Sequence, residues 1–127
     1  MARILIAEDE KDIRELVTFT LRGLANHDVV QAVNGLEAVE KAQVEKPDLI
    51  LMDGRMPRMN GYEACARLKE IEETKDIPVV FLSAKGQESE IKEGLTAGAH
   101  DYILKPFAPD ELVHRVQEIL NKHGIAS

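Results

Sequence analysis

Residues 48–57 have the sequence Asp48-Leu49-Ile50-Leu51-Met52-Asp53-Gly54-Arg55-Met56-Pro57, and the rest of the chain is arranged around them. Four apolar residues end on a carboxylate, and Gly54 and Pro57 then prevent the run from continuing as a strand. A short apolar run that is preceded by Pro47 and followed by such breakers predicts a strand buried on both faces. Asp53 alone could simply cap a helix or a turn, so its meaning depends on the residues at the ends of the other strands.

The bulk properties predict one acidic domain over residues 1–127, since domains most often contain about 100–150 residues. A single cysteine, Cys65, excludes an intramolecular disulfide, and we expect it to be buried. No apolar run approaches the ~20 residues of a membrane span, and no signal-peptide pattern is present, so we expect a cytoplasmic protein without membrane contact. A net charge of −7 without a basic stripe argues against direct nucleic-acid binding.

Strand and helix patterns alternate along the whole chain. Short apolar runs predict further strands at residues 4–7, 29–32, 79–82 and 102–104. Apolar positions at three- and four-residue spacing predict helices at about 13–24, 35–46, 61–71, 87–97 and 109–122. Five strands that alternate with five helices over short connections predict an α/β fold, an open three-layer sandwich of the flavodoxin-like type with a parallel sheet. Gly94, inside the fourth helix, indicates either close packing or a loosely held helix.

Polar residues follow the strands at the points where the strands end. In a parallel sheet these ends lie at one edge, where ligands bind in such folds. Asn34, after the second strand, is explained as a helix cap. The remaining side chains are costly to desolvate without partners, and so predict one shared site. They are Glu8, Asp9, Asp53, Ser83 and Lys105.

This set of side chains permits a narrow range of chemistry. Clustered carboxylates repel one another, so a divalent cation with a preference for oxygen ligands, Mg²⁺ or Mn²⁺, is the expected partner. Asp53 could then attack a phosphorus atom as a carboxylate nucleophile and form an acyl phosphate. Lys105 and the Ser83 hydroxyl would pair with the phosphoryl oxygens. Catalysis would consist of positioning and charge neutralisation.

Four motifs, in order and at matching spacing, resemble a known family over essentially the whole chain. They are Ala7-Glu8-Asp9-Glu10, residues 51–61, Leu82-Ser83-Ala84, and residues 101–107 with Lys105-Pro106. The family is the CheY-like receiver domain of bacterial two-component response regulators. The resemblance implies a sheet order of 2-1-3-4-5 and a cis bond between Lys105 and Pro106.

The resemblance also implies a role for each site residue. Asp53 would be the phosphoacceptor, and Asp9, Asp53 and the backbone carbonyl of Arg55 would bind Mg²⁺, with Glu8 acting mostly through water. Ser83 and Ala84 would contact the phosphoryl group and Lys105 would pair with it. Tyr102 matches the aromatic residue whose rotamer reports activation. Arg55 and Lys85 occupy two variable positions that flank the phosphoryl site, where we expect them to tune its lifetime.

The implied function is a switch that accepts a phosphoryl group from a sensor histidine kinase or a phosphotransfer protein. Phosphorylation would change the face formed by the fourth helix, fifth strand and fifth helix, and thereby control a partner or output domain. In the subgroup with winged-helix output, charge pairs on this face form dimers. Asp101, Glu111 and Arg115 match that set, whereas Ile91 and His100 do not. The resemblance therefore allows a phosphorylation-dependent homodimer.

Two other functions fit the pattern less well, and the protein is not expected to be an enzyme with classical turnover. A phosphatase with an aspartyl phosphate intermediate commonly keeps a second Asp two residues after the first, where this chain has Arg55. A flavodoxin-like cofactor-binding module needs a phosphate-cradling loop after the first strand, where Glu8-Asp9-Glu10 would repel phosphate. The four histidines, His27, His100, His114 and His123, are expected to be exposed and without function.

Overall fold

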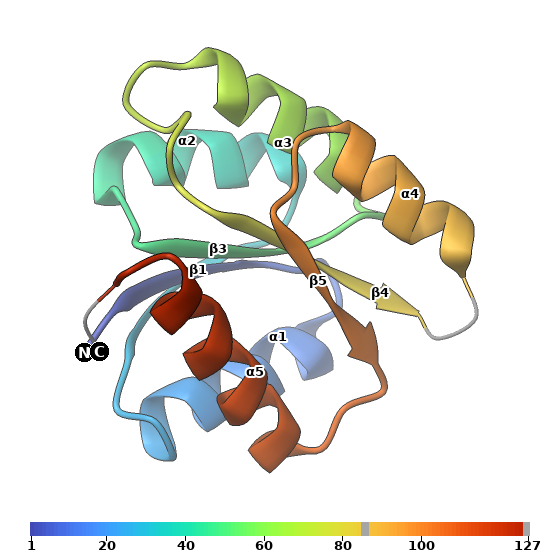
Figure 1. Ribbon diagram of the computed structural model, residues 1–127. Coiled ribbons are helices and arrows are strands. Elements are labelled where there is room, and N and C mark those ends of the chain that lie inside the picture. The colour runs from blue at the N-terminus through green and yellow to red at the C-terminus, as the bar shows by residue number, and fades with distance from the viewer. Residues whose placement is uncertain (85–86, 126–127) are drawn as a thin grey trace.

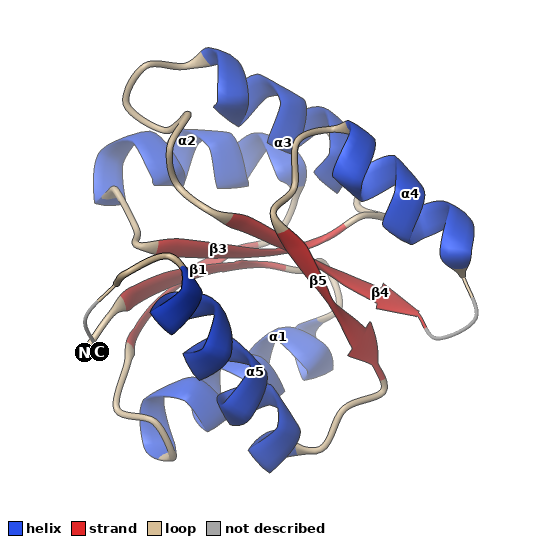
Figure 2. Cartoon of the chain, in the orientation of Figure 1, coloured by secondary structure: helices blue, strands red, loops and turns tan. Residues whose placement is uncertain are grey.

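A computed structural model of the chain describes residues 1–84 and 87–125 and contains the expected alternation of strands and helices (Figure 1, Figure 2). Within those residues the strands are β1 (Arg3–Ala7), β2 (Asp28–Ala32), β3 (Leu49–Asp53), β4 (Val79–Ala84) and β5 (Asp101–Lys105). The helices are α1 (Lys11–Gly23), α2 (Gly35–Glu45), α3 (Gly61–Glu70), α4 (Glu88–Thr96) and α5 (Pro109–Lys122). None of the helices described is long and apolar enough to cross a membrane. Lys85, predicted to flank the site, lies outside the described residues.

The strands form one parallel sheet in the order β2-β1-β3-β4-β5, which confirms the predicted fold. The chain moves outward from β1 to β2 on one side and from β3 to β5 on the other, so the order reverses between β1 and β3. Ala7 is paired with Met52, and the residues that follow them, Glu8 and Asp53, therefore emerge at the same level of the sheet. A reversal point of this kind is where open α/β sheets bind ligands.

Helices cover both faces of the sheet: α1 and α5 lie on one side, and α2, α3 and α4 on the other (Figure 1). The central strand β3 is buried along its whole length, as predicted. Its residues alternate between two cores, because successive side chains of a strand point to opposite faces. Leu49 and Leu51 pack toward α1 and α5, whereas Ile50 and Met52 pack toward the other layer.

Caps begin two of the helices directly after the loops at the carboxyl edge of the sheet. The Asn34 side chain accepts a hydrogen bond from the backbone N–H of Glu37 at 2.8 Å, as expected for the start of α2. Asn60 and Glu63 form a complete capping box at the start of α3. These caps define where each loop ends, and so they hold the loops around the sheet edge in place.

Gly94 packs closely against β4, which favours the packing interpretation over a loosely held helix. A Cβ atom at Gly94 would lie 2.7 Å from Cδ2 of Phe81. The Phe81 ring is stacked on Tyr62 of α3, with 5.0 Å between the ring centroids. The ring is therefore enclosed between α3 and α4. The distance between α4 and β4 is so short that only a glycine fits at position 94.

The expectation that all four histidines are exposed is wrong for His27 and for His123, which is half-buried. His27 is buried, with 5% of its surface exposed, because it lies just before β2 and next to Ala2, the residue before β1. Its Nδ1 atom accepts a hydrogen bond from the backbone N–H of Ala2 at 3.2 Å, which requires an unprotonated Nδ1. Cys65 is buried, as predicted.

Candidate functional site

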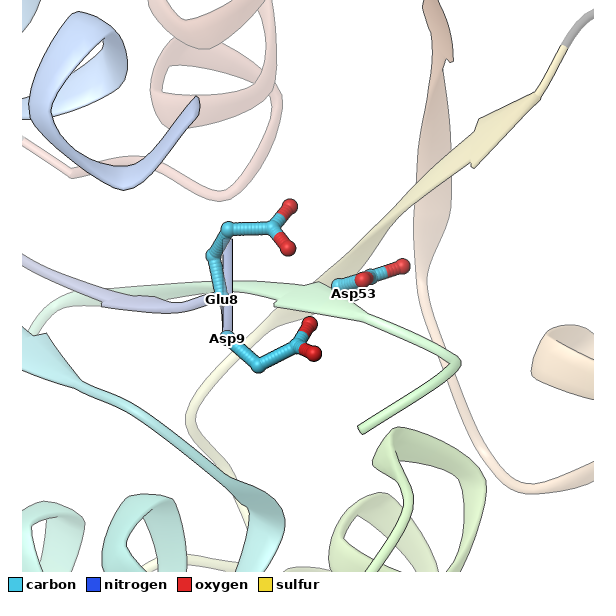
Figure 3. A group of neighbouring side chains, drawn as sticks. All are labelled: Glu8, Asp9 and Asp53. Carbon is cyan, nitrogen blue, oxygen red and sulfur yellow. The ribbon is translucent and has the colours of Figure 1, made fainter. Parts of the chain in front are cut away.

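The carboxyl ends of β1 and β3 bring three carboxylates together. Glu8 and Asp9 follow β1 and converge on Asp53 at the end of β3 (Figure 3). One oxygen from each of the three lies within 4.8 Å of the others. Glu8 is completely buried, Asp53 is 8% exposed, and Asp9 is exposed to solvent. The site is thus closed at its base and open at its rim.

In the part of the chain that the structure describes, one ammonium group forms ion pairs with these carboxylates. Lys105, the last residue of β5, places Nζ 3.6 Å from Oε1 of Glu8 and 3.5 Å from Oδ1 of Asp53. Both distances are those of ion pairs and are longer than good hydrogen bonds. The cluster therefore keeps an excess of negative charge, which one lysine shared between two acids does not neutralise.

The ionisation of Glu8 shows this excess most clearly. Burial and the neighbouring Asp53 carboxylate raise the pKa of Glu8 to about 8, whereas Lys105 and the backbone N–H of Glu10 lower it. Oε1 of Glu8 is buried and has no hydrogen-bond partner within the described residues. A buried carboxylate oxygen normally has a partner. A divalent cation with oxygen ligands, Mg²⁺ or Mn²⁺, fits this need.

Arg14, which the sequence pattern did not single out, holds the backbone of the acidic pair. Its Nη1 atom donates to the carbonyl of Glu8 at 2.8 Å and to that of Asp9 at 3.3 Å. The side chain is half-buried in the first turns of α1. The only signal in the sequence is a cation about one helical turn after the acids, beside the apolar stripe of that helix.

The residues predicted to contact the phosphoryl group lie at the end of β4. Leu82 is paired with Asp53, so Ser83, which is 1% exposed, and Ala84 follow at the site edge. The backbone N–H of Ala84 donates to Oε1 of Glu90 at 3.3 Å. Oε2 of the same carboxylate accepts from Nε of Arg55 at 3.0 Å. Sequence reasoning did not identify Glu90 because it comes from α4 rather than from a strand end.

A cavity of about 370 Å³ opens beside the acidic cluster and is bordered mainly by the loop between β3 and α3. Asp9 and Arg55 lie on its wall, together with Gly54, Met56, Pro57, Asn60, Tyr62 and Glu93. Gly54 is needed here, because a Cβ atom at this position would overlap the Tyr62 ring. The cavity has room for a phosphate-sized group beside Asp9 and the residues that follow Asp53.

The predicted dimer residues lie on the face formed by α4, β5 and α5, and each has a partner within the chain. Arg115 donates to Oδ1 of Asp101 at 3.0 Å and to the carbonyl of Tyr102 at 2.7 Å. Glu111 accepts from the backbone N–H of Ala108 at 3.0 Å. Half-buried Tyr102 lies on the wall of a second cavity, of about 390 Å³, next to Phe107. The Lys105–Pro106 bond is cis, as the resemblance implied.

Comparisons with known proteins agree with this geometry. A family model described as the response regulator receiver domain matches residues 4–117. The phosphate regulon transcriptional regulatory protein PhoB of Pseudomonas aeruginosa is 44% identical over 121 residues, which are 95% of this chain and 52% of that protein. The chain therefore spans about half the length of the curated relatives it matches.

Solved structures of similar proteins share the fold. The chemotaxis protein CheY4 of Vibrio cholerae is 33% identical with a TM-score of 0.87, and the match covers 94% of this chain and 99% of that one. The signal receiver domain of a signal transduction histidine kinase from Syntrophus aciditrophicus is 32% identical with a TM-score of 0.85, over 96% and 92% of the two chains.

Proposed function

The chain belongs to the response regulator receiver domain family of two-component signalling, and on this premise we propose that it is a switch phosphorylated on Asp53. One observation carries the proposal: Glu8, Asp9 and Asp53 converge at the reversal point of the sheet, with the Lys105 ammonium as their only ion-pair partner in the described part of the chain. The donor would be a sensor histidine kinase or a phosphotransfer protein.

The proposed reaction transfers the phosphoryl group between two side chains. A carboxylate oxygen of Asp53 forms a bond to phosphorus as the phosphorus–nitrogen bond to the donor imidazole breaks. The electron pair leaves with the imidazole nitrogen, which takes up a proton from solvent. Lys105, the Ser83 hydroxyl and the backbone N–H of Ala84 hold the phosphoryl oxygens.

The acidic cluster supplies the cation site that this reaction requires. Asp9, Asp53 and the backbone carbonyl of Arg55 would hold Mg²⁺ or Mn²⁺, with Glu8 acting mostly through water. The bound cation would offset the negative charge of the attacking carboxylate and of the phosphoryl oxygens. Arg14 keeps the Glu8–Asp9 backbone in place for this purpose.

Phosphorylation would then be transmitted to the face formed by α4, β5 and α5. The acyl phosphate carries roughly −1.5 to −2 charges near neutral pH, in place of the single negative charge of the ionised Asp53 carboxylate. Ser83 would move toward these charges and leave space into which Tyr102 turns. A partner or an output segment would read the changed face, and a homodimer through Asp101, Glu111 and Arg115 would require their present intrachain partners to exchange.

The protein would act as a phosphoacceptor rather than a turnover enzyme. The position two residues after Asp53, where an aspartyl phosphatase would keep an acid, is Arg55 in an ion pair with Glu90. Relatives about twice as long include a protein named as a transcriptional regulator, so control of an output elsewhere belongs to the proposal. A cytoplasmic location, in reach of a kinase domain that uses ATP, is part of it as well.

Incubation with acetyl phosphate and Mg²⁺ tests the proposal. Intact-mass spectrometry should show the gain of one phosphoryl group, which is absent when a chelator removes Mg²⁺. The Asp53→Ala variant should gain nothing. Labelling of Asp53→Ala to the extent of the parent protein would show that the assignment is wrong.

A further inference from the structure

We propose that Glu90 is a positioning residue that occupies, before phosphorylation, the two donors next to Asp53 that a phosphoryl group would take. These donors are the backbone N–H of Ala84 and the guanidinium of Arg55. Phosphorylation of Asp53 would displace Glu90 and with it the first turn of α4. This inference rests on the proposed function and adds to it a second route from the phosphoryl group to α4.

The geometry places one carboxylate between two elements that flank the site. Oε1 of Glu90 accepts from the N–H at the end of β4, and Oε2 accepts from Nε of a residue in the loop after β3. Asp53, the last residue of β3, is paired in register with Leu82, two residues before the end of β4. Glu90 therefore closes the space between the two strand ends from the side of α4.

Burial distinguishes the two partners of the ion pair. The Glu90 side chain is only 13% exposed, whereas that of Arg55 is 75% exposed. The carboxylate is thus largely shielded from solvent, and the guanidinium lies on its solvent side. An exposed ion pair contributes little to stability by itself. The hydrogen bond from Ala84 and the burial of the carboxylate therefore hold Glu90 in place more than the charge of Arg55 does.

The surrounding charges make this arrangement sensitive to a new anion. Burial, followed by the charges of Glu90 and Glu93, raises the pKa of Tyr62 to about 12, whereas Arg55 lowers it. Two acids of α4 thus act on the same small region next to Asp53. A phosphoryl group would compete with Glu90 for its two donors and would also repel it, since both carry negative charge.

The displacement has a defined direction along α4. Glu90 lies in the first turn of the helix, and Gly94, one turn later, is held against the Phe81 ring. Loss of the Glu90 contacts would free the first turn while the close contact at Gly94 stays in place. The N-terminal end of α4 would therefore move away from β4 more than its C-terminal end.

The Glu90→Ala variant tests the inference, with Glu88→Ala as the matched control. Glu88 is exposed in the same turn and bears the same charge. With acetyl phosphate and Mg²⁺, the phosphorylation rate of Glu90→Ala should exceed those of the parent and the control by about fivefold. That factor corresponds to the net strength of one hydrogen bond. A gain in rate cannot result from loss of the fold.

The NMR signal of the Ala84 amide supplies a second readout that needs no phosphodonor. It should shift in unphosphorylated Glu90→Ala and stay in place in Glu88→Ala. This inference alone would be overturned if the parent is labelled, Glu90→Ala is phosphorylated at the same rate as the parent, and the Ala84 signal does not shift in Glu90→Ala. A parent that is not labelled at all would overturn the proposed function, and this inference with it.

Discussion

Among the described residues, three carboxylates face one ammonium at the carboxyl edge of the sheet, and the proposed function depends on this imbalance of charge. Glu8 is the residue that shows it, because its buried Oε1 lacks a hydrogen-bond partner among the described residues and its pKa is raised to about 8. A buried carboxylate without a partner lowers the stability of the folded protein. A bound cation would supply the missing partner and offset this loss of stability.

Arg14 provides the first prediction at this scale. Arg14→Met should weaken Mg²⁺ binding by about tenfold, the lower end of what lost outer-shell contacts cost a metal site. The reason is that the carbonyls of Glu8 and Asp9 lose their shared donor. Titration calorimetry measures the affinity, since the chain has no tryptophan to report it.

The control for this prediction lies on the same helix. Arg22 donates to the carbonyl of Val29 at 2.8 Å, far along α1 from the acidic cluster. Arg22→Met should leave Mg²⁺ affinity at the parent value. Arg14→Lys should recover only part of it, because an ammonium lacks the planar fork of the guanidinium. Equal affinities in Arg14→Met and Arg22→Met would exclude the proposed role of Arg14.

His27 provides a prediction about pH. Burial lowers the pKa of His27 from its ordinary value of 6.5. The folded protein therefore binds this proton less readily than the unfolded chain, and stability is fully present above the unfolded pKa and lost as the pH falls through the folded value. Taken alone, His27 makes the free energy of unfolding decrease as the pH falls from about 7 to about 5, where histidines titrate. Glu8, whose pKa is raised to about 8, acts in the opposite direction over the same range, so the contribution of His27 is measured as a difference from a variant.

A variant separates His27 from the other histidine that titrates in the same direction. Burial and the charges of Lys69, His123 and Lys122 also lower the pKa of His100. As the pH falls from about 7 to about 5, urea unfolding at each pH should show the parent losing free energy of unfolding relative to His27→Gln. The same pH dependence in both proteins would mean that His27 does not contribute to it.

At the scale of secondary structure, the loop after β3 is held between its strand and α3. The backbone N–H of Gly61 donates to the carbonyl of Gly54 at 3.0 Å, and a Cβ atom at Gly61 would overlap the carbonyl of Asp53. The start of α3 is thus packed directly on the residue proposed as phosphoacceptor. Arg55, whose carbonyl is proposed as a cation ligand, lies in the same short loop.

The contact between α4 and β4 gives a prediction about an element. Gly94→Ala should lower the free energy of unfolding, since overpacking costs about 1–3 kcal/mol and the gain in helix propensity is about 1 kcal/mol. The Phe81 ring cannot move aside easily because Tyr62 is stacked on it. Urea unfolding measures the change.

Gly23 at the end of α1 is the matched control for the same substitution. A Cβ atom there would meet only the Phe19 ring, at 4.0 Å. Gly23→Ala should therefore raise the free energy of unfolding by up to about 1 kcal/mol. If both variants gained stability, α4 would not be packed on β4 as described.

For the molecule as a whole, Mg²⁺ should stabilise the fold. At a Mg²⁺ concentration about 100 times its Kd, binding adds about 2.7 kcal/mol and should raise Tm by roughly 10 °C. Asp9→Asn should lose most of this rise, because it removes a ligand at the rim. Asp12→Asn, an exposed acid in the first turn of α1, should keep it. A rise of equal size in Asp9→Asn would contradict the assigned cation site.

The sequence predicted the sheet and its site edge because strand ends in a parallel sheet are forced together by topology alone. The sequence alone, without a measured distance, was thus enough to place Glu8, Asp53 and Lys105 in one site. Arg14 and Glu90 could not, since both lie on helices, where reach depends on how the helix is rotated and packed. The contact of His27 with Ala2 depends likewise on the pairing of two distant segments.

The central claim is that Asp53 itself carries the phosphoryl group. Borohydride reduces an aspartyl phosphate to homoserine, and peptide mapping after treatment with acetyl phosphate, Mg²⁺ and borohydride would locate the change. Homoserine is expected at position 53 and at no other aspartate, and it should disappear when Mg²⁺ is chelated. Homoserine at Asp9, or an unchanged Asp53 in phosphorylated protein, would contradict the claim.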